Sequence, residues 1–318
     1  MVLPLVFMGT PDFALPSLAA LAKNYDLRAV VTQPDRAKGR GKVLAFPPVK
    51  EWSLKNGIRV LQPSRLDKLF LEELKSIAPA IIITVAYGRI LPKAVLDLPP
   101  LGCINLHASL LPAYRGAAPI HRAVINGEKE TGVTVIYMTE ELDAGDIILQ
   151  ESIPIKKEDT AGTIHDILAE RGASLLLKAI HLLETKTAKP YPQDASQATY
   201  APPLKPEEEK IDWSKPATEI YNLIRGMNPW PVAYTYFQGR RLKVWGASLL
   251  DKMTGLAASP GEVISVGEKG IKVSAGVGEL LITEVQPAGR CRMSAVSFSH
   301  GHVLKKGCRL GENSSVKE

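Results

Sequence analysis

The first half of the chain alternates short apolar runs with segments of helical periodicity. The apolar runs are rich in isoleucine and valine and predict strands at residues 3–8, 27–32, 80–85, 102–106 and 132–138. Between and after them the pattern predicts helices, including those at residues 68–77, 119–126 and 160–184. Continuously apolar strands separated by helices are typical of a mostly parallel sheet covered on both faces. We therefore expect a Rossmann-like α/β domain with its site beyond the carboxyl ends of the strands.

The second half has a different pattern. Five prolines between residues 189 and 206 predict an extended, semi-rigid linker. After one helix at residues 217–225, short strands with glycine turns follow at residues 233–237, 241–245, 261–265, 270–275 and 280–285. Such spacing favours a small OB-like β-barrel. The expected organisation is an α/β domain at 1–188, a linker at 189–208 and a barrel domain at 209–318.

Size and composition agree with two domains of an ordinary globular protein. The chain has 318 residues, of which 45% are hydrophobic and 23% charged. Its three cysteines lie far apart and form neither a C-x-x-C nor a Cys/His metal pattern, so we expect reduced thiols and no metal. The first strand begins at residue 3, and no apolar run approaches membrane-spanning length. We expect a cytoplasmic protein without membrane contact.

Positive charge is concentrated in one loop and in the second domain. The formal net charge is +6, and residues 204–318 carry 16 basic and 12 acidic side chains. Residues 34–50 hold a single acid, Asp35, against the basic side chains of Arg36, Lys38, Arg40, Lys42 and Lys50. Basic side chains in a glycine-rich loop of this length favour phosphate binding, but solvated charged loops are also common. The loop alone leaves both interpretations open.

The strand at residues 102–106 runs into a polar pair. Side chains alternate along a strand, so Asn105 and His107 point to one face while Ile104 and Leu106 point to the other. An amide donor beside an imidazole suits a reacting carbonyl, because the amide can stabilise developing negative charge and the ring can handle a proton. A core histidine beside a structural asparagine explains the pair equally well.

A carboxylate that could complete this pair lies in the turn Leu142-Asp143-Ala144-Gly145-Asp146. Asp and Gly are turn formers, so a plain turn is the simpler interpretation. In the functional interpretation Asp143 reaches His107, orients the ring and favours its charged form. Asp146 is the alternative carboxylate.

Together these segments resemble the methionyl-tRNA formyltransferases, a family of folate-dependent formyltransferases. The resemblance covers nearly the whole chain and rests on Asn-x-His-x-Ser-Leu-Leu-Pro at 105–112, followed by Leu-Asp-x-Gly-Asp at 142–146. Further matching segments lie at residues 9–13, 33–50, 85–88, 115–120, 213 and 228–231. Ala113 departs from the family pattern, in which a basic residue is usual, and residues after Met293 match weakly.

The resemblance implies a substrate pair and site residues. It implies transfer of the formyl group of 10-formyltetrahydrofolate, a co-substrate, to the α-amino group of initiator methionyl-tRNA, with no metal. Asn105, His107 and Asp143 would be catalytic. The folate would contact Ser109, Leu110, Leu111, Pro112 and Tyr87, and the tRNA acceptor end would contact Arg40, Lys42 and Arg36. We also expect a monomer.

Three other classes of protein stay open. A formyltransferase acting on a sugar nucleotide or purine precursor would keep the same three polar residues and differ in its acceptor. A nicotinamide oxidoreductase is disfavoured because Gly9-Thr10-Pro11-Asp12-Phe13 lacks the G-x-G-x-x-G fingerprint. A non-enzymatic RNA-binding protein would function without Asn105.

Overall fold

A computed structural model describes residues 3–38, 43–250 and 258–312. The chain forms two compact units that are not continuous in sequence. The first comprises Met1–Pro119, Glu130–Pro154 and His165–Pro202, and the second comprises Ile120–Lys129, Ile155–Ile164 and Pro203–Glu318. Residues 189–202 of the expected linker thus belong to the first unit. The sequence boundaries expected at 188 and 208 stay a prediction.

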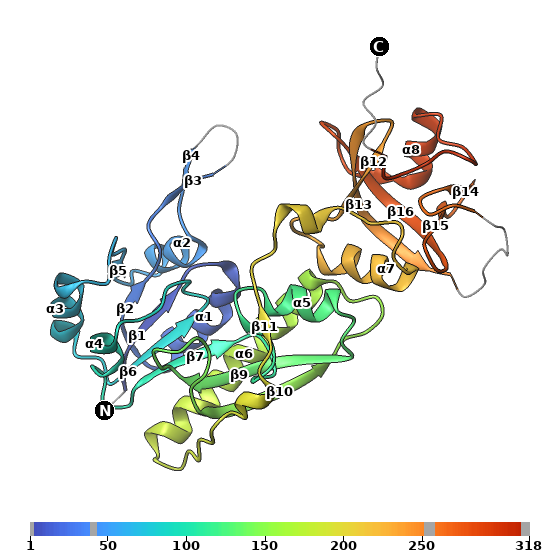
Figure 1. The fold of residues 1–318 in the computed structure, drawn as a ribbon. Helices are drawn as coiled ribbons and strands as arrows, with labels where there is room; N and C mark the ends of the chain where they lie inside the picture. The colour runs from blue at the N-terminus through green and yellow to red at the C-terminus, as the bar shows by residue number, and fades with distance from the viewer. Residues whose placement is uncertain (1–2, 39–42, 251–257, 313–318) are drawn as a thin grey trace. The chain divides into compact units, whose positions relative to one another are not determined.

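The first unit is built on a seven-stranded sheet with the order β10-β9-β7-β6-β1-β2-β5 (Figure 1). The strands that run from β5 to β7 pair in parallel, whereas β9 pairs antiparallel with both β7 and β10. Their bounds are β1 Pro4–Gly9, β2 Asp26–Val31, β5 Val60–Leu61, β6 Ile81–Val85, β7 Cys103–His107, β9 Glu130–Tyr137 and β10 Ile147–Pro154.

Helices cover both faces of this sheet. They are α1 (Leu15–Asn24), α2 (Pro48–Lys55), α3 (Lys68–Ile77), α4 (Lys93–Leu96) and α6 (Ala161–Glu184). Helix α5 (Pro119–Ile125) belongs to the second unit from Ile120 onward. One face packs against α3 and α4 through a buried cluster that includes Val6, Met8, Ile82, Cys103, Phe70, Leu74 and Val95. The other face lies against α6, where a Cβ on Gly172 would meet Leu106 at 2.6 Å. Alternate residues of each strand therefore serve two cores, which explains the continuously apolar runs.

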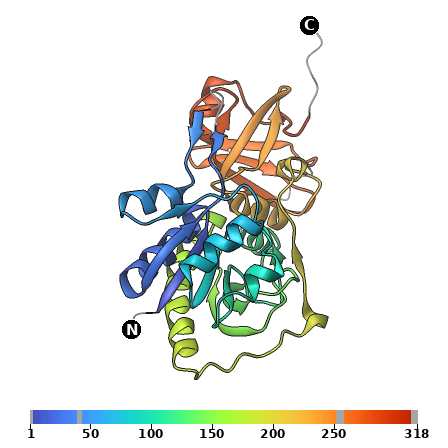
Figure 2. The same cartoon turned by 90° about the vertical axis from the view of Figure 1, so that its left-hand side faces the viewer.

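Short elements complete the first unit. The basic loop begins and ends as a two-stranded hairpin of β3 (Arg36–Lys38) and β4 (Val43–Ala45). The segment after α6 runs extended along the first unit (Figure 2). It contains the 3₁₀ turn η2 (Ala195–Gln197) and β11 (Tyr200–Ala201), which pairs with β8 (Arg115–Gly116). The 3₁₀ turn η1 (Asp12–Ala14) also lies in the first unit, whereas η3 (Pro206–Glu209) belongs to the second.

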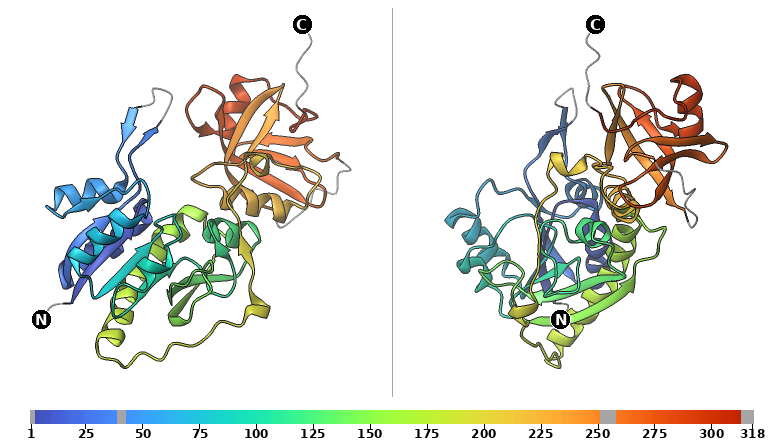
Figure 3. Two further views of the ribbon diagram at one scale, coloured as in Figure 1. Left: turned by 60° about the vertical axis from the view of Figure 1, so that its left-hand side comes forward. Right: turned by 45° about the vertical axis from the view of Figure 1, so that its right-hand side comes forward.

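The second unit contains an antiparallel sheet with the order β12-β13-β16-β15-β14, and β17 pairs with β16. Helices α7 (Ala217–Gly226) and α8 (Ala295–Gly301) pack against it (Figure 3). The strands are β12 Tyr234–Phe237, β13 Arg240–Leu249, β14 Val263–Gly267, β15 Gly270–Ser274, β16 Glu279–Pro287 and β17 Met293–Ser294. Trp213 is buried in this core, and its indole N–H donates to Thr235 at 2.9 Å.

The predicted fold class is confirmed. The first unit is a mostly parallel α/β sheet and the second is an antiparallel β domain, and the five strands expected between residues 233 and 285 all occur with shifted ends. The pattern did not predict β5, α2 or α4. These elements have two, eight and four residues, and such short segments give weak periodicity.

Candidate active site

The polar pair lies at the carboxyl end of β7. Cys103 packs into the α3/α4 core and Leu106 faces α6, so strand alternation places Asn105 and His107 on the face of Cys103. His107 is the last residue of the strand and is only 6% exposed. This is the edge at which parallel α/β sheets bind ligands, as the sequence predicted.

The His107 ring lies between two hydrogen-bond acceptors. Its Nδ1 is 3.5 Å from Oδ2 of Asp143, and its Nε2 is 2.9 Å from the backbone oxygen of Tyr114. The side chains of His107 and Asp143 are 7% and 13% exposed, so solvent screens this pair weakly.

Asp143 lies in the turn that follows the carboxyl end of β9, and this turn brings its carboxylate to the His107 ring. Asp143 has a φ of +51°, a left-handed conformation that aspartate tolerates better than most residues. Its Oδ2 accepts the backbone N–H of Gly116 at 2.9 Å. A Cβ on Gly145 would meet the backbone oxygen of Tyr137 at 1.9 Å, so the turn requires glycine there. Asp146, the alternative carboxylate, is exposed.

The amide of Asn105 is oriented by the neighbouring strand. Thr84 of β6 pairs with Asn105 in the sheet register, and its hydroxyl donates to Oδ1 of Asn105 at 2.6 Å. Because the amide oxygen is used in this way, the amide nitrogen is the atom that can donate to a ligand. No hydrogen bond of that nitrogen is present within the described residues. The asparagine is partly exposed, whereas Thr84 is buried.

The expected folate-binding segment is a tightly anchored loop. The Ser109 hydroxyl donates to the backbone oxygen of Ala113 at 2.7 Å, and Thr134 donates to the backbone oxygen of Ser109 at 2.6 Å. Ser109 and Leu111 are 1% and 3% exposed. A ligand on this loop would therefore meet its backbone and the partly exposed Leu110 and Pro112.

Tyr87, the other residue expected at the folate, is 3% exposed and lies in the α3/α4 core. Its hydroxyl is buried without a hydrogen-bond partner within the described residues, and burial raises its pKa. Its backbone oxygen accepts from Thr10 and Gln33 at 3.1 Å each. The ring thus serves the core, and only its unpaired hydroxyl offers a polar contact.

The basic hairpin has a rigid base. Lys50 pairs with both carboxylate oxygens of Asp35, at 2.9 and 2.6 Å, and Gln62 donates to the same carboxylate at 2.7 Å. The hydrogen bonds from Gln62 and Lys50 lower the pKa of Asp35. Arg36 is exposed at the start of β3. Arg40 and Lys42 lie outside the described residues.

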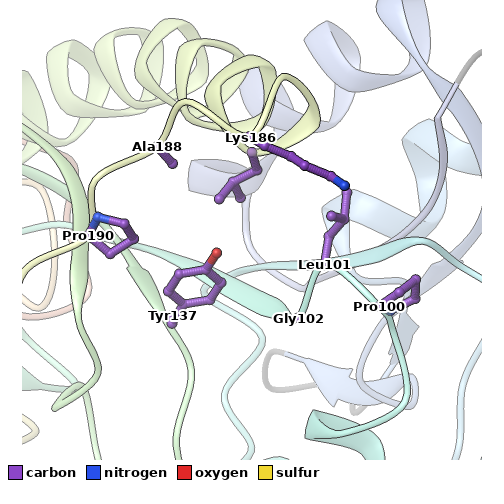
Figure 4. Close-up of a pocket in the computed structure, with 8 residues that line it drawn as sticks. Pro100, Leu101, Gly102, Tyr137, Lys186, Ala188 and Pro190 are labelled. Atoms are coloured by element: carbon purple, nitrogen blue, oxygen red, sulfur yellow. The ribbon is translucent and has the colours of Figure 1, made fainter.

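Other features of the first unit lie away from His107. A cavity of about 370 Å³ is lined by Gly102, Tyr137, Lys186 and their neighbours, at the opposite end of β7 (Figure 4). Burial raises the pKa of the Cys103 thiol to about 12, which makes it a poor nucleophile at neutral pH. The part of the chain that the structure describes contains no cluster of three metal-binding side chains and no helix able to span a membrane.

Two residues that hold the site were missed by the sequence analysis. Thr84 is the one polar residue in the strand Ile81–Val85, and that signal could have identified it. Gln193 lies in the proline-containing segment and donates to the backbone oxygens of Asp143 and Gly145. Nothing in the pattern around Gln193 distinguishes it from an ordinary linker residue.

Comparison with known proteins defines the family. Residues 4–180 match the family model for the formyl transferase domain, and residues 203–303 match that for the formyl transferase C-terminal domain. The chain belongs to the formyl transferase family.

Relatives of high identity carry a more specific name. A methionyl-tRNA formyltransferase of Moorella thermoacetica is 56% identical over 96% of this chain and 99% of its own length. A methionyl-tRNA formyltransferase of Bacillus subtilis is 48% identical over 97% of this chain and 98% of its own length.

Solved structures with the same fold are more distant in sequence. An N-formyltransferase of Helicobacter canadensis, in complex with folinic acid and dTDP-3-aminofucose, has a TM-score of 0.65 at 22% identity, covering 90% of this chain and 99% of its own. A methionyl-tRNA formyltransferase of Clostridium thermocellum has a TM-score of 0.54 at 20% identity, covering 79% and 95%. At such identities the similarity supports the fold alone.

Proposed function

We propose that this protein transfers a formyl group from 10-formyltetrahydrofolate to the α-amino group of methionyl initiator tRNA. The observation that carries the proposal is the buried His107–Asp143 contact of 3.5 Å on the sheet face that also holds Asn105. The substrates are proposed because relatives about half identical over nearly their whole length are named methionyl-tRNA formyltransferase.

The reaction needs an oxyanion to be stabilised and a proton to be moved. The methionyl amine attacks the formyl carbon, a new C–N bond forms, and a tetrahedral oxyanion develops. The bond from that carbon to the folate nitrogen then breaks. The attacking amine loses one proton, and the departing nitrogen of tetrahydrofolate gains one. No net oxidation occurs, and no metal is required by this balance.

Asn105 and His107 have different tasks in this scheme. The Asn105 amide nitrogen donates to the oxyanion, since Thr84 holds the amide oxygen on the other side. His107 is a second donor. Its Nε2 contacts the backbone oxygen of Tyr114, so that hydrogen bond must be replaced by one to the oxyanion. Asp143 orients the ring and takes part in removing the proton of the amine. Pre-oriented donors of this kind typically contribute about 3 kcal/mol each to transition-state stabilisation.

The folate donor is proposed to bind on the loop that follows β7. Leu110 and Pro112 offer partly exposed apolar side chains on this loop. Tyr87 is proposed to contact the folate through its hydroxyl, which is buried without a partner within the described residues, so that this contact requires the ring to move. Ser109 and Leu111 hold the loop in shape and would contact the folate through their backbone atoms.

The tRNA is proposed to contact both units. Arg36, with Arg40 and Lys42, would bind the acceptor end. In the second unit the outward face of β12 and β13 combines aromatic and cationic side chains. The Arg241 guanidinium lies 3.6 Å from the centre of the Tyr234 ring and pairs with Glu209, a carboxylate that a phosphate would have to displace. Lys243 is the register partner of Tyr234. Such a face suits a nucleic-acid backbone with its bases. The monomeric state and cytoplasmic location stay predictions.

This face should make tRNA binding sensitive to salt. The double substitution Arg241→Ala and Lys243→Ala is expected to raise the KM for tRNA. It should also make the fall of log affinity with log salt concentration less steep, by about 0.7–0.9 in slope for each phosphate that is no longer neutralised. The KM for the folate should stay unchanged. Affinity measured over a range of salt concentrations tests this, with the double substitution Lys23→Ala and Lys68→Ala, at two exposed lysines of the first unit, as the charge-matched control. An unchanged slope would remove the face from the interface.

The direct test of the proposed function is incubation with 10-formyltetrahydrofolate and methionyl initiator tRNA, followed by analysis of the esterified amino acid. N-formylmethionine is the expected product. Parallel reactions with an amino sugar nucleotide and with a purine-precursor amine test the alternative acceptors. Transfer to one of those and not to the tRNA would replace the proposal.

A further inference from the structure

The side chain of Gln193 uses its full hydrogen-bonding capacity. Its Nε2 donates to the backbone oxygens of Asp143 and Gly145, at 2.8 Å each. Its Oε1 accepts from Nε and Nη2 of Arg115, at 3.2 and 2.7 Å. A glutamine amide offers two donor hydrogens and an acceptor oxygen with two lone pairs, and all of them are engaged here. Exposed linker residues rarely have such a complete set of partners.

These contacts form a closed cycle of hydrogen-bonded residues that includes Asp143. Arg115 and Gly116 are consecutive, and the Gly116 N–H donates to Oδ2 of Asp143 while the Arg115 side chain donates to Gln193. Gln193 returns to the backbone of Asp143. Asp143 is therefore held through its side chain by Gly116 and through its main chain by Gln193.

This cycle of contacts matters because the backbone conformation of Asp143 is energetically unfavourable without support. Its φ of +51° is in the left-handed region, and its carboxylate must reach a ring nitrogen 3.5 Å away. Arg115 is 7% exposed, so its positive charge is buried. The side-chain oxygen of Gln193 is a direct hydrogen-bond partner of that charge. Removal of the two donors of Gln193 would free the turn to swing its carboxylate away from His107.

We infer that Gln193 is a positioning residue for the reaction. It acts through its contacts with the Asp143 turn, by fixing Asp143 against His107. The inference rests on the proposed function, because the orientation of Asp143 affects the chemical step only if His107 and Asp143 catalyse it. Misplacement of a catalytic group by about 1 Å can lower a rate by about 10²-fold, so the expected effect lies on kcat.

The test compares three variants of the full chain. Gln193→Met keeps the length of the side chain and removes every hydrogen bond. Gln193→Glu keeps the acceptor for Arg115 and removes both donors to the Asp143 turn. Gln197→Met is the matched control, because Gln197 lies in the same segment and its side chain bonds only Asp194 in the described structure.

Both Gln193 variants are expected to lose roughly 10–100-fold in kcat, with the KM for folate donor and for tRNA within about twofold of wild type. Gln197→Met should retain wild-type kinetics. The separation of kcat from KM is decisive, because a merely structural role would alter unfolding temperature or both KM values instead. If Gln193→Met does not fold, Gln193→Glu decides the question alone.

The possible results distinguish failure of the positioning role of Gln193 from failure of the proposed function. If wild type and Gln197→Met both transfer the formyl group and the Gln193 variants keep their kcat, the positioning role is wrong. The same holds if kcat falls only together with a rise in both KM values. If wild type transfers no formyl group to methionyl-tRNA, the proposed function fails first.

Discussion

Replacing Asp143 with asparagine is expected to lower kcat for formyl transfer by roughly 10²–10⁴-fold. Asparagine has the same shape and its Oδ1 can still accept the Gly116 N–H, so the turn should keep its conformation. The substitution replaces the negative charge that faces Nδ1 of His107 at 3.5 Å by a neutral amide. Single-turnover formylation at saturating substrates measures the effect.

Asp146→Asn is the matched control, since Asp146 belongs to the same turn and its side chain is exposed. It should retain near wild-type activity, and tRNA affinity should be unchanged in both variants. The comparison also decides between the two carboxylates that the sequence left open. Equal losses in both variants, or a larger loss in Asp146→Asn, would contradict the role given to Asp143.

Replacing Asn105 with alanine is expected to lower kcat by roughly 10²–10³-fold, the usual effect of removing one oxyanion donor. The KM values should change little, because the donor acts on charge that develops during the reaction. Thr84→Val is an informative companion, since it removes the hydroxyl that holds the amide oxygen and leaves the amide itself in place. We expect a smaller loss of kcat in that variant.

Rates at saturating substrate, measured for both variants, distinguish the two effects. Unfolding temperatures serve as the control, because Asn105 lies at the edge of the core and its truncation should barely alter stability. A variant Asn105→Ala that keeps full kcat would show that the amide has only a structural role.

The sequence predicted the architecture well because both cores are strongly patterned. The helix at residues 68–77 begins and ends as expected, since Asp67 caps it and Ala78 ends it in a left-handed conformation. Strand alternation likewise placed Asn105 and His107 on one face. These features depend on local periodicity, which the sequence displays directly.

The details of the site could not be predicted in this way. The contact of Tyr114 with His107 and the contact of Gln193 with Asp143 join segments 7 and 50 residues apart through backbone oxygens. A backbone oxygen has no residue type, so no pattern of side chains reveals it. The burial of Ser109 and Leu111 follows from how their loop folds back on Thr134, which is again a tertiary contact.

The discontinuous composition of the second unit limits how the polypeptide can be divided. Residues 120–129 and 155–164 leave the catalytic part of the chain and fold with residues that follow Pro203. Arg122 pairs there with Glu208, and Ile125 packs directly on Gly226. A catalytic fragment cut at residue 202 would carry both of these segments, but it would lose the Arg122–Glu208 ion pair and leave apolar side chains such as that of Ile125 uncovered. Dissection by truncation is thus poorly suited to this enzyme, and point substitutions are the sounder approach.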